Sequence, residues 1–213
     1  MGNTFQMNLA EMYNASNYKI ATDKLAQIGW TIPQNMTYMT LIKISRAPEA
    51  DVAAYMKEYF TLNNYEKFDD LLRQISNSKI RKDIIEVTEE CRAVFGQGHY
   101  AVCAMALSAV IEGLLSKYLT DKQDIRMKKL CKEQIETFPE DGHLIDKCVW
   151  DSIYRFISDF FQKSDFNASE PDEINRHWLL HGRADYSGIN EIDCLRLFNV
   201  VGSICVIANH EQA

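Results

Sequence analysis

The sequence feature that most constrains the fold is the apolar stretch at 101–115. It is shorter than the ~20 residues that a helix needs to cross a bilayer, and Ser108 and Glu112 interrupt it. Polar residues recur at intervals of four, from Tyr100 through Ser108 to Glu112, so they line one stripe of a helix whose other faces are aliphatic. We therefore expect a buried helix at about 99–119 and no membrane span.

Apolar residues spaced by three and four recur along the rest of the chain and predict further helices. The clearest of these are expected at about 80–95, 144–162, 171–181 and 189–209. Gly96 and Gly98 predict the end of the first, because glycine adopts the left-handed conformation that closes a helix. Internal repeats and alternating strand patterns are absent from the sequence. The predicted fold is all-α, with an N-terminal helical extension at 1–79 and a helical bundle at 80–213.

The charge balance argues against a protein that coats nucleic acid. Lys and Arg number 23 against 30 Asp and Glu, which gives a net charge of −7 and repels phosphates at long range. A site with its own local cations stays open, because net charge does not determine the chemistry of a pocket. The six cysteines form no C-x-x-C pair, and the N-terminus lacks a signal-peptide pattern. We therefore expect buried thiols and a cytoplasmic location.

Glu112 is the one acidic residue on the apolar helix. A buried carboxylate is costly unless it is paired, so Glu112 should face an arginine, a histidine or backbone donors from another helix. Two interpretations are open: a structural ion pair that fixes the register of the helix, or a residue that orients a catalytic arginine.

A short helix is predicted after a linker at 163–170. Ser169 is a suitable cap residue and Pro171 suits the first turn, so the helix should begin at about residue 171. Gly182 is placed to end it directly after His181. Acidic side chains outnumber basic ones around this helix, so any contact with nucleic acid should involve few phosphates.

The two histidines of this helix, His177 and His181, are four residues apart and share a face, which is the spacing of two helical zinc ligands. Trp178 occupies the position at which a metalloprotease helix carries its glutamate. Asp185 or His210 could complete a zinc site, but nothing in their spacing demands it. We therefore expect neither a metal nor a cofactor.

Arg176 and His181 combine a fixed cation with a group that titrates near neutrality. Cleaving RNA without a metal requires a proton to leave a ribose 2′-hydroxyl, the charge of a phosphorane to be neutralised, and a leaving oxygen to be protonated. An arginine and histidines suit these tasks. The structural alternative is a helix whose histidines are core groups and whose arginine pairs with Glu112.

Arg176, four further residues and His181, with the polar His177 directly after the arginine, resemble the R-x4-6-H signature of the HEPN superfamily (higher eukaryotes and prokaryotes nucleotide-binding). Asn175 before the motif and Gly182 after it are similar to the flanks seen in bacterial members. The apolar helix upstream also resembles the one that precedes the motif in such proteins. The resemblance covers roughly residues 80–209.

The resemblance implies a compact helical bundle that commonly dimerises, so that two copies of the motif meet in one cleft. Active members are metal-independent endoribonucleases, often toxins or anti-phage effectors, that leave 2′,3′-cyclic phosphate ends. Carried over, Arg176 would contact the scissile phosphate and His181 would act as general base or acid, with Asn175, His177 and Glu112 in support. The implied partners are RNA or a nucleotide, a second copy, and an antitoxin or sensor protein. Other members are inactive modules that bind nucleotides or proteins, which is the alternative for this chain.

Overall fold

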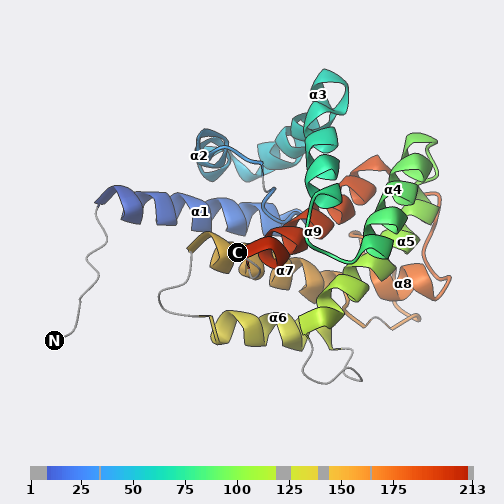
Figure 1. Cartoon of the computed structure of the whole chain (residues 1–213). Helices are drawn as coiled ribbons and strands as arrows, with labels where there is room; N and C mark the ends of the chain where they lie inside the picture. Colours follow the sequence, from blue (N-terminus) through green and yellow to red (C-terminus); the bar gives the residue numbers. More distant parts are fainter. Residues whose placement is uncertain (1–8, 34, 119–125, 139–143, 164, 211–213) are drawn as a thin grey trace.

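The computed structural model describes residues 9–33, 35–118, 126–138, 144–163 and 165–210. Within these ranges all regular secondary structure is helical, which confirms the predicted all-α class (Figure 1). The helices are α1 (Leu9–Gln27), α2 (Tyr38–Arg46), α3 (Glu49–Ser76), α4 (Lys82–Gly96), α5 (Tyr100–Leu115), α6 (Met127–Glu136), α7 (Leu144–Phe160), α8 (Arg176–Leu180) and α9 (Glu191–His210). A 3-10 turn, Ser116–Tyr118, extends α5.

Helix α9 forms the centre of the molecule and packs against α3, α5 and α7 (Figure 1). Nearly every side chain from Cys194 to Ala208 is buried, as expected for a helix that is apolar on all sides. At Gly202 on α9, an added Cβ would overlap the end of the Leu71 side chain on α3. Glycine at this position therefore leaves room for the Leu71 side chain between the two helices.

Helix α5 confirms the predicted apolar helix and lies between α4 and α9. Ala104 and Ser108 on its polar stripe are fully buried, and the Ser108 hydroxyl donates to the Ala104 carbonyl over 2.7 Å. The stripe is not buried along its whole length, since 27% of the Glu112 side chain is exposed. No helix in the described ranges is long and apolar enough to cross a membrane.

The described residues before position 80 share one hydrophobic core with the rest of the described chain. Trp30 stacks on Phe60 with ring centroids 5.2 Å apart. The buried Asn199 amide on α9 donates to the carbonyl of Thr31 over 2.8 Å. The predicted boundary at residue 79 falls in the short connection between α3 and α4.

Helix α3 is broken in its middle. Leu62 is extended, and the next three residues, Asn63, Asn64 and Tyr65, have φ between 51° and 64°. Asparagine tolerates this left-handed conformation better than most residues. The hydroxyl of Tyr65 donates to the Glu191 carboxylate, which ties the break to the first turn of α9.

All six cysteines are free thiols, and five of them are buried, as the sequence predicted. Cys103 donates a weak hydrogen bond to the carbonyl of Cys91 over 3.4 Å. Burial raises the pKa of Cys131 to about 12 and that of Cys205 to about 11. These thiols stay protonated near neutral pH, so they behave as small apolar core residues.

Candidate functional site

Helix α8, which carries the arginine and the first histidine, begins at Arg176 and not at Pro171. The predicted start is wrong because Asn175 takes the cap position. Its side-chain oxygen accepts hydrogen bonds from the amides of His177, over 2.9 Å, and Trp178, over 3.2 Å. Residues 170–174 instead run across the surface without helical structure.

Asn175 also joins α8 to the end of α7. Its side-chain amide donates to the carbonyls of Asp159, over 3.1 Å, and Gln162, over 3.0 Å. The residue is buried, with 6% of its surface exposed. Asn175 therefore supports the motif through the backbone, by fixing where α8 starts.

The end of α8 agrees with the sequence prediction. His181 is the last residue of the turn, and Gly182 follows with φ +69°. The amide of Arg183 then returns to the carbonyl of Trp178 over 2.9 Å. This closure leaves His181 and Arg183 exposed at the end of the helix.

Glu112 and Arg176 form the predicted ion pair between α5 and α8. The exposed fractions of the two side chains are 27% and 28%, so the pair is neither fully buried nor open to solvent. The Arg176 guanidinium also lies 5.1 Å from the centroid of the Phe161 ring. Its Nε atom is buried without a hydrogen-bond partner in the described residues. One carboxylate and one ring thus hold the guanidinium and leave part of it accessible.

His177 and His181 form an aromatic cluster with Phe166. The two imidazole centroids are 4.7 Å apart with the rings nearly perpendicular, and His177 stacks on Phe166 at 4.5 Å. His181 meets the edge of Phe166 at 5.8 Å. Sequence reasoning missed Phe166, which lies in the predicted linker at 163–170. The signal for it is slight, since it is the one aromatic residue in an otherwise polar segment.

Arg176 and the histidines contact different neighbours within one chain. Arg176 contacts Glu112 and Phe161, whereas His181 contacts Phe166 and His177. Successive residues of an α-helix are turned by about 100°, so Arg176 and His177 leave α8 in different directions. The structure therefore brings together Glu112 with Arg176, and His177 with His181, as two adjacent pairs.

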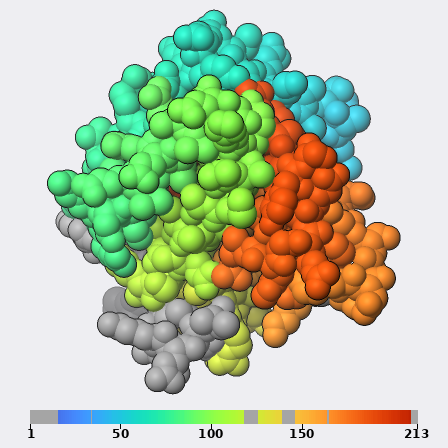
Figure 2. Space-filling model, turned by 90° about the vertical axis from the view of Figure 1, so that its right-hand side faces the viewer, coloured from blue at the N-terminus to red at the C-terminus, as the bar shows by residue number. Residues whose placement is uncertain are grey.

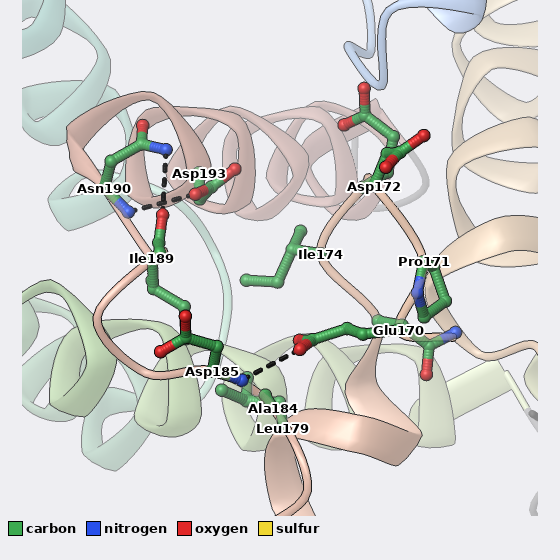
Figure 3. Close-up of a pocket in the computed structure, with 13 residues that line it drawn as sticks. Glu170, Pro171, Asp172, Ile174, Leu179, Ala184, Asp185, Ile189, Asn190 and Asp193 are labelled. Atoms are coloured by element: carbon green, nitrogen blue, oxygen red, sulfur yellow. Dashed lines mark hydrogen bonds between the residues drawn. The ribbon is translucent and has the colours of Figure 1, made fainter. Parts of the chain in front are cut away.

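The acidic residues around α8 gather in a pocket of about 260 Å³ (Figure 3). It lies between the segments at 170–175 and 184–193, and Ile174 and Leu179 line its apolar part. Its acidic members are Glu170, Asp172, Glu173, Asp185 and Asp193. Such a lining disfavours phosphate, so this side of α8 is unsuited to a nucleic-acid backbone.

Two contacts hold the rim of the acidic pocket. The backbone amide of Asp185 donates to the Glu170 carboxylate over 2.9 Å, and the backbone amide of Asn190 donates to the Asp193 carboxylate over 3.0 Å (Figure 3). Burial raises the pKa of Asp193. Hydrogen bonds from Ser187 lower that of Asp185. Both carboxylates are thus committed to local structure.

The described residues contain no group of three or more side chains placed to hold a metal ion. Asp185, which the sequence left open as a ligand, accepts hydrogen bonds from Ser187. The side chain of His210 lies outside the described residues.

The connection from α8 into α9 lies on the surface next to α4 and α5, as Figure 2 shows (red-orange beside green). Cys194 at the start of α9 donates to the Tyr100 carbonyl of α5 over 3.3 Å. The candidate site therefore rests on the central helices and is open at the molecular surface.

Comparisons with protein-family models, curated proteins and solved structures found no match for this chain. The resemblance to the HEPN superfamily therefore stays a prediction that rests on the residues of the motif and its flanks.

Proposed function

We propose that this chain is a metal-independent endoribonuclease with a HEPN-like helical bundle, in which Arg176 and His181 cut RNA. The observation that carries the proposal is the pairing of Arg176 with Glu112 beside a pair of histidines on the same short turn. A partly exposed guanidinium with a fixed orientation is suited to a crowded phosphate. Imidazoles are suited to moving protons near neutral pH.

The chemistry is an internal transfer at phosphorus. A base removes the proton of a ribose 2′-hydroxyl, the 2′-oxygen bonds to phosphorus, and the 5′-oxygen of the next nucleotide leaves and takes up a proton. The products are a 2′,3′-cyclic phosphate and a 5′-hydroxyl. His181 exchanges protons with the reacting oxygens, Arg176 neutralises the phosphorane, and Glu112 keeps Arg176 in place.

Each site is shared between two copies of the chain, so a symmetric dimer contains two sites. A single chain turns Arg176 and His181 toward different neighbours, so one chain alone does not bring both side chains to the same phosphate. A symmetric dimer places Arg176 of one copy beside His181 of the other. We place such an enzyme in the cytoplasm, as a toxin or anti-phage effector that an antitoxin or sensor protein restrains.

The second candidate is a module that binds a nucleotide or a protein without turnover. The observation that favours it is the neutralisation of Arg176 by Glu112, next to an acidic pocket. Both features weaken the attraction for the extended phosphate chain of RNA. A single phosphate or a carboxylate of a partner still fits the exposed part of the guanidinium.

Incubation of the purified protein with total RNA in excess EDTA distinguishes the two candidates. The wild type is compared with Arg176→Ala, His181→Ala and the matched control Arg92→Ala. Arg92 lies on the surface of α4 and pairs with Asp69 of α3. The ribonuclease predicts cleavage by the wild type and the control, cyclic phosphate ends, and loss of cleavage in both motif variants. Binding of a nucleotide that depends on Arg176, without cleavage, favours the module instead.

A further inference from the structure

Phe166 is a large apolar side chain held in the open beside the motif. Its exposed fraction is 36%, and the described residues on either side of it, at 163–170, are exposed as well. A local turn presents the ring: the Asn167 amide donates to the Asp165 carboxylate over 2.9 Å, and the Ala168 amide donates to the Asp165 carbonyl over 2.9 Å. The position of the ring is therefore built by specific contacts.

The surroundings of the Phe166 ring are aromatic and cationic. His177 lies against it at 4.5 Å with an angle of 16° between the planes, and the Arg183 guanidinium lies 5.5 Å from its centroid. Trp178 meets it edge-on at 5.3 Å. Exposed aromatic rings stack on nucleobases whatever the base, and a nearby arginine adds a cation–π contact or a phosphate contact.

We propose that Phe166 is a stacking platform for one unpaired base of the RNA, and that Arg183 contacts the phosphate next to that base. The inference rests on the proposed function and narrows its substrate to RNA with an unpaired nucleotide at the site. A base inside a duplex has both faces covered by its neighbours and is not free to stack on a side chain.

The charges around α8 direct the strand to the same side. The acidic pocket lies on the face of α8 that carries Leu179, whereas Phe166 contacts the face that carries His177 and His181. Phosphates are repelled by the first face and meet Arg183 at the second. A base on Phe166 thus holds the backbone of the strand beside the motif histidines.

Binding to a short single-stranded RNA that carries 2-aminopurine tests the platform without any cleavage. All riboses are 2′-O-methylated, so the oligonucleotide lacks the attacking hydroxyl, and stacking of 2-aminopurine quenches its fluorescence. The wild type is compared with Phe166→Leu, which keeps an apolar side chain but loses the ring, and with Phe166→Tyr, which keeps the ring. Met39→Ala, which shortens an exposed apolar side chain on α2, is the control.

We expect Phe166→Leu to raise Kd by about 5- to 150-fold and to abolish the quenching, because stacking of one base contributes about 1–3 kcal/mol. Phe166→Tyr and Met39→Ala should stay close to the wild type. A fully paired hairpin with the same modified base should bind more weakly and show no quenching. Circular dichroism spectra of all variants check that they fold alike.

Several outcomes overturn the platform. One is an equal Kd for the wild type and Phe166→Leu, and another is equal binding of the hairpin and the single strand by the wild type. The proposal also fails if the wild type binds neither RNA. Tighter binding by Phe166→Leu would overturn it too, because the ring would then cover the site. The ribonuclease proposal fails separately. If the oligonucleotide stacks on Phe166 but total RNA is never cut, the platform stands and the enzyme does not.

Discussion

Replacement of Glu112 by glutamine removes the charge opposite Arg176 with little change in shape. Exposed ion pairs contribute about 0.2–1 kcal/mol, and breaking a fully buried pair costs about 3–5 kcal/mol. With exposed fractions of 27% and 28%, the Glu112–Arg176 pair lies between these cases, so we expect a coupling energy of about 1–2 kcal/mol. For a chain of this length that corresponds to a loss of about 2–8 °C in Tm.

A double-mutant cycle measures this coupling. Urea unfolding of the wild type, Glu112→Gln, Arg176→Gln and the double variant gives the interaction energy free of the effects of each single change. The exposed pair Lys82–Glu86 on α4 is the control, and its coupling should not exceed about 0.5 kcal/mol. A Glu112–Arg176 coupling no larger than that of the control would refute the claim that the carboxylate holds the arginine in place.

Three further predictions concern the fold. Gly202→Ala should lower the free energy of unfolding by about 1–3 kcal/mol, because the new Cβ overlaps the Leu71 side chain of α3. The control Gly96→Ala places its Cβ in open space and should not destabilise the fold. Equal urea midpoints for the two variants would contradict the overlap at Gly202. Asn175→Ala should cost about 1–2 kcal/mol and lower the hydrogen-exchange protection of α8, and unchanged protection would rule out its capping role. Stability should fall above about pH 8.5, because the fold raises the pKa of Cys131 and Cys205 while the unfolded chain releases these protons at its lower pKa. Urea midpoints that stay constant up to about pH 10, or that fall equally when both cysteines are replaced by alanine, would contradict this.

The sequence predicted the parts of the fold that depend on local pattern. Gly96 and Gly98 mark the end of α4, and the apolar period marks α5 and α9. The Glu112–Arg176 pair was also predictable from the sequence, because a carboxylate on an apolar helix needs a cation and the motif provides one.

The features that the sequence predicted wrongly or missed depend on contacts between separate segments of the chain. Ser169 and Pro171 resemble the start of a helix, but Asn175 is the residue that caps α8. Its side-chain amide also donates to the carbonyls at the end of α7. Phe166 has no periodic partner in the sequence, and its neighbours appear only when the turn folds back onto His177. Local patterns therefore located α8 approximately and left its environment unpredicted.

The net charge of −7 is unevenly distributed around α8. Acidic residues dominate this part of the sequence, but the fold collects five of them in one pocket. Arg183 remains exposed beside Phe166 on the side that carries the histidines. A chain with an acidic surface thus keeps a small area suited to a few phosphates.

The central claim is that Arg176 and His181 cut RNA together although one chain turns them to different neighbours. The most direct test mixes equal amounts of Arg176→Ala and His181→Ala, each inactive alone, under conditions in which subunits exchange. Half of the dimers are then mixed, and each mixed dimer contains one intact site and one site that lacks both residues, so we expect cleavage at about a quarter of the wild-type rate. A mixture as inactive as its two components, with exchange verified, would contradict it.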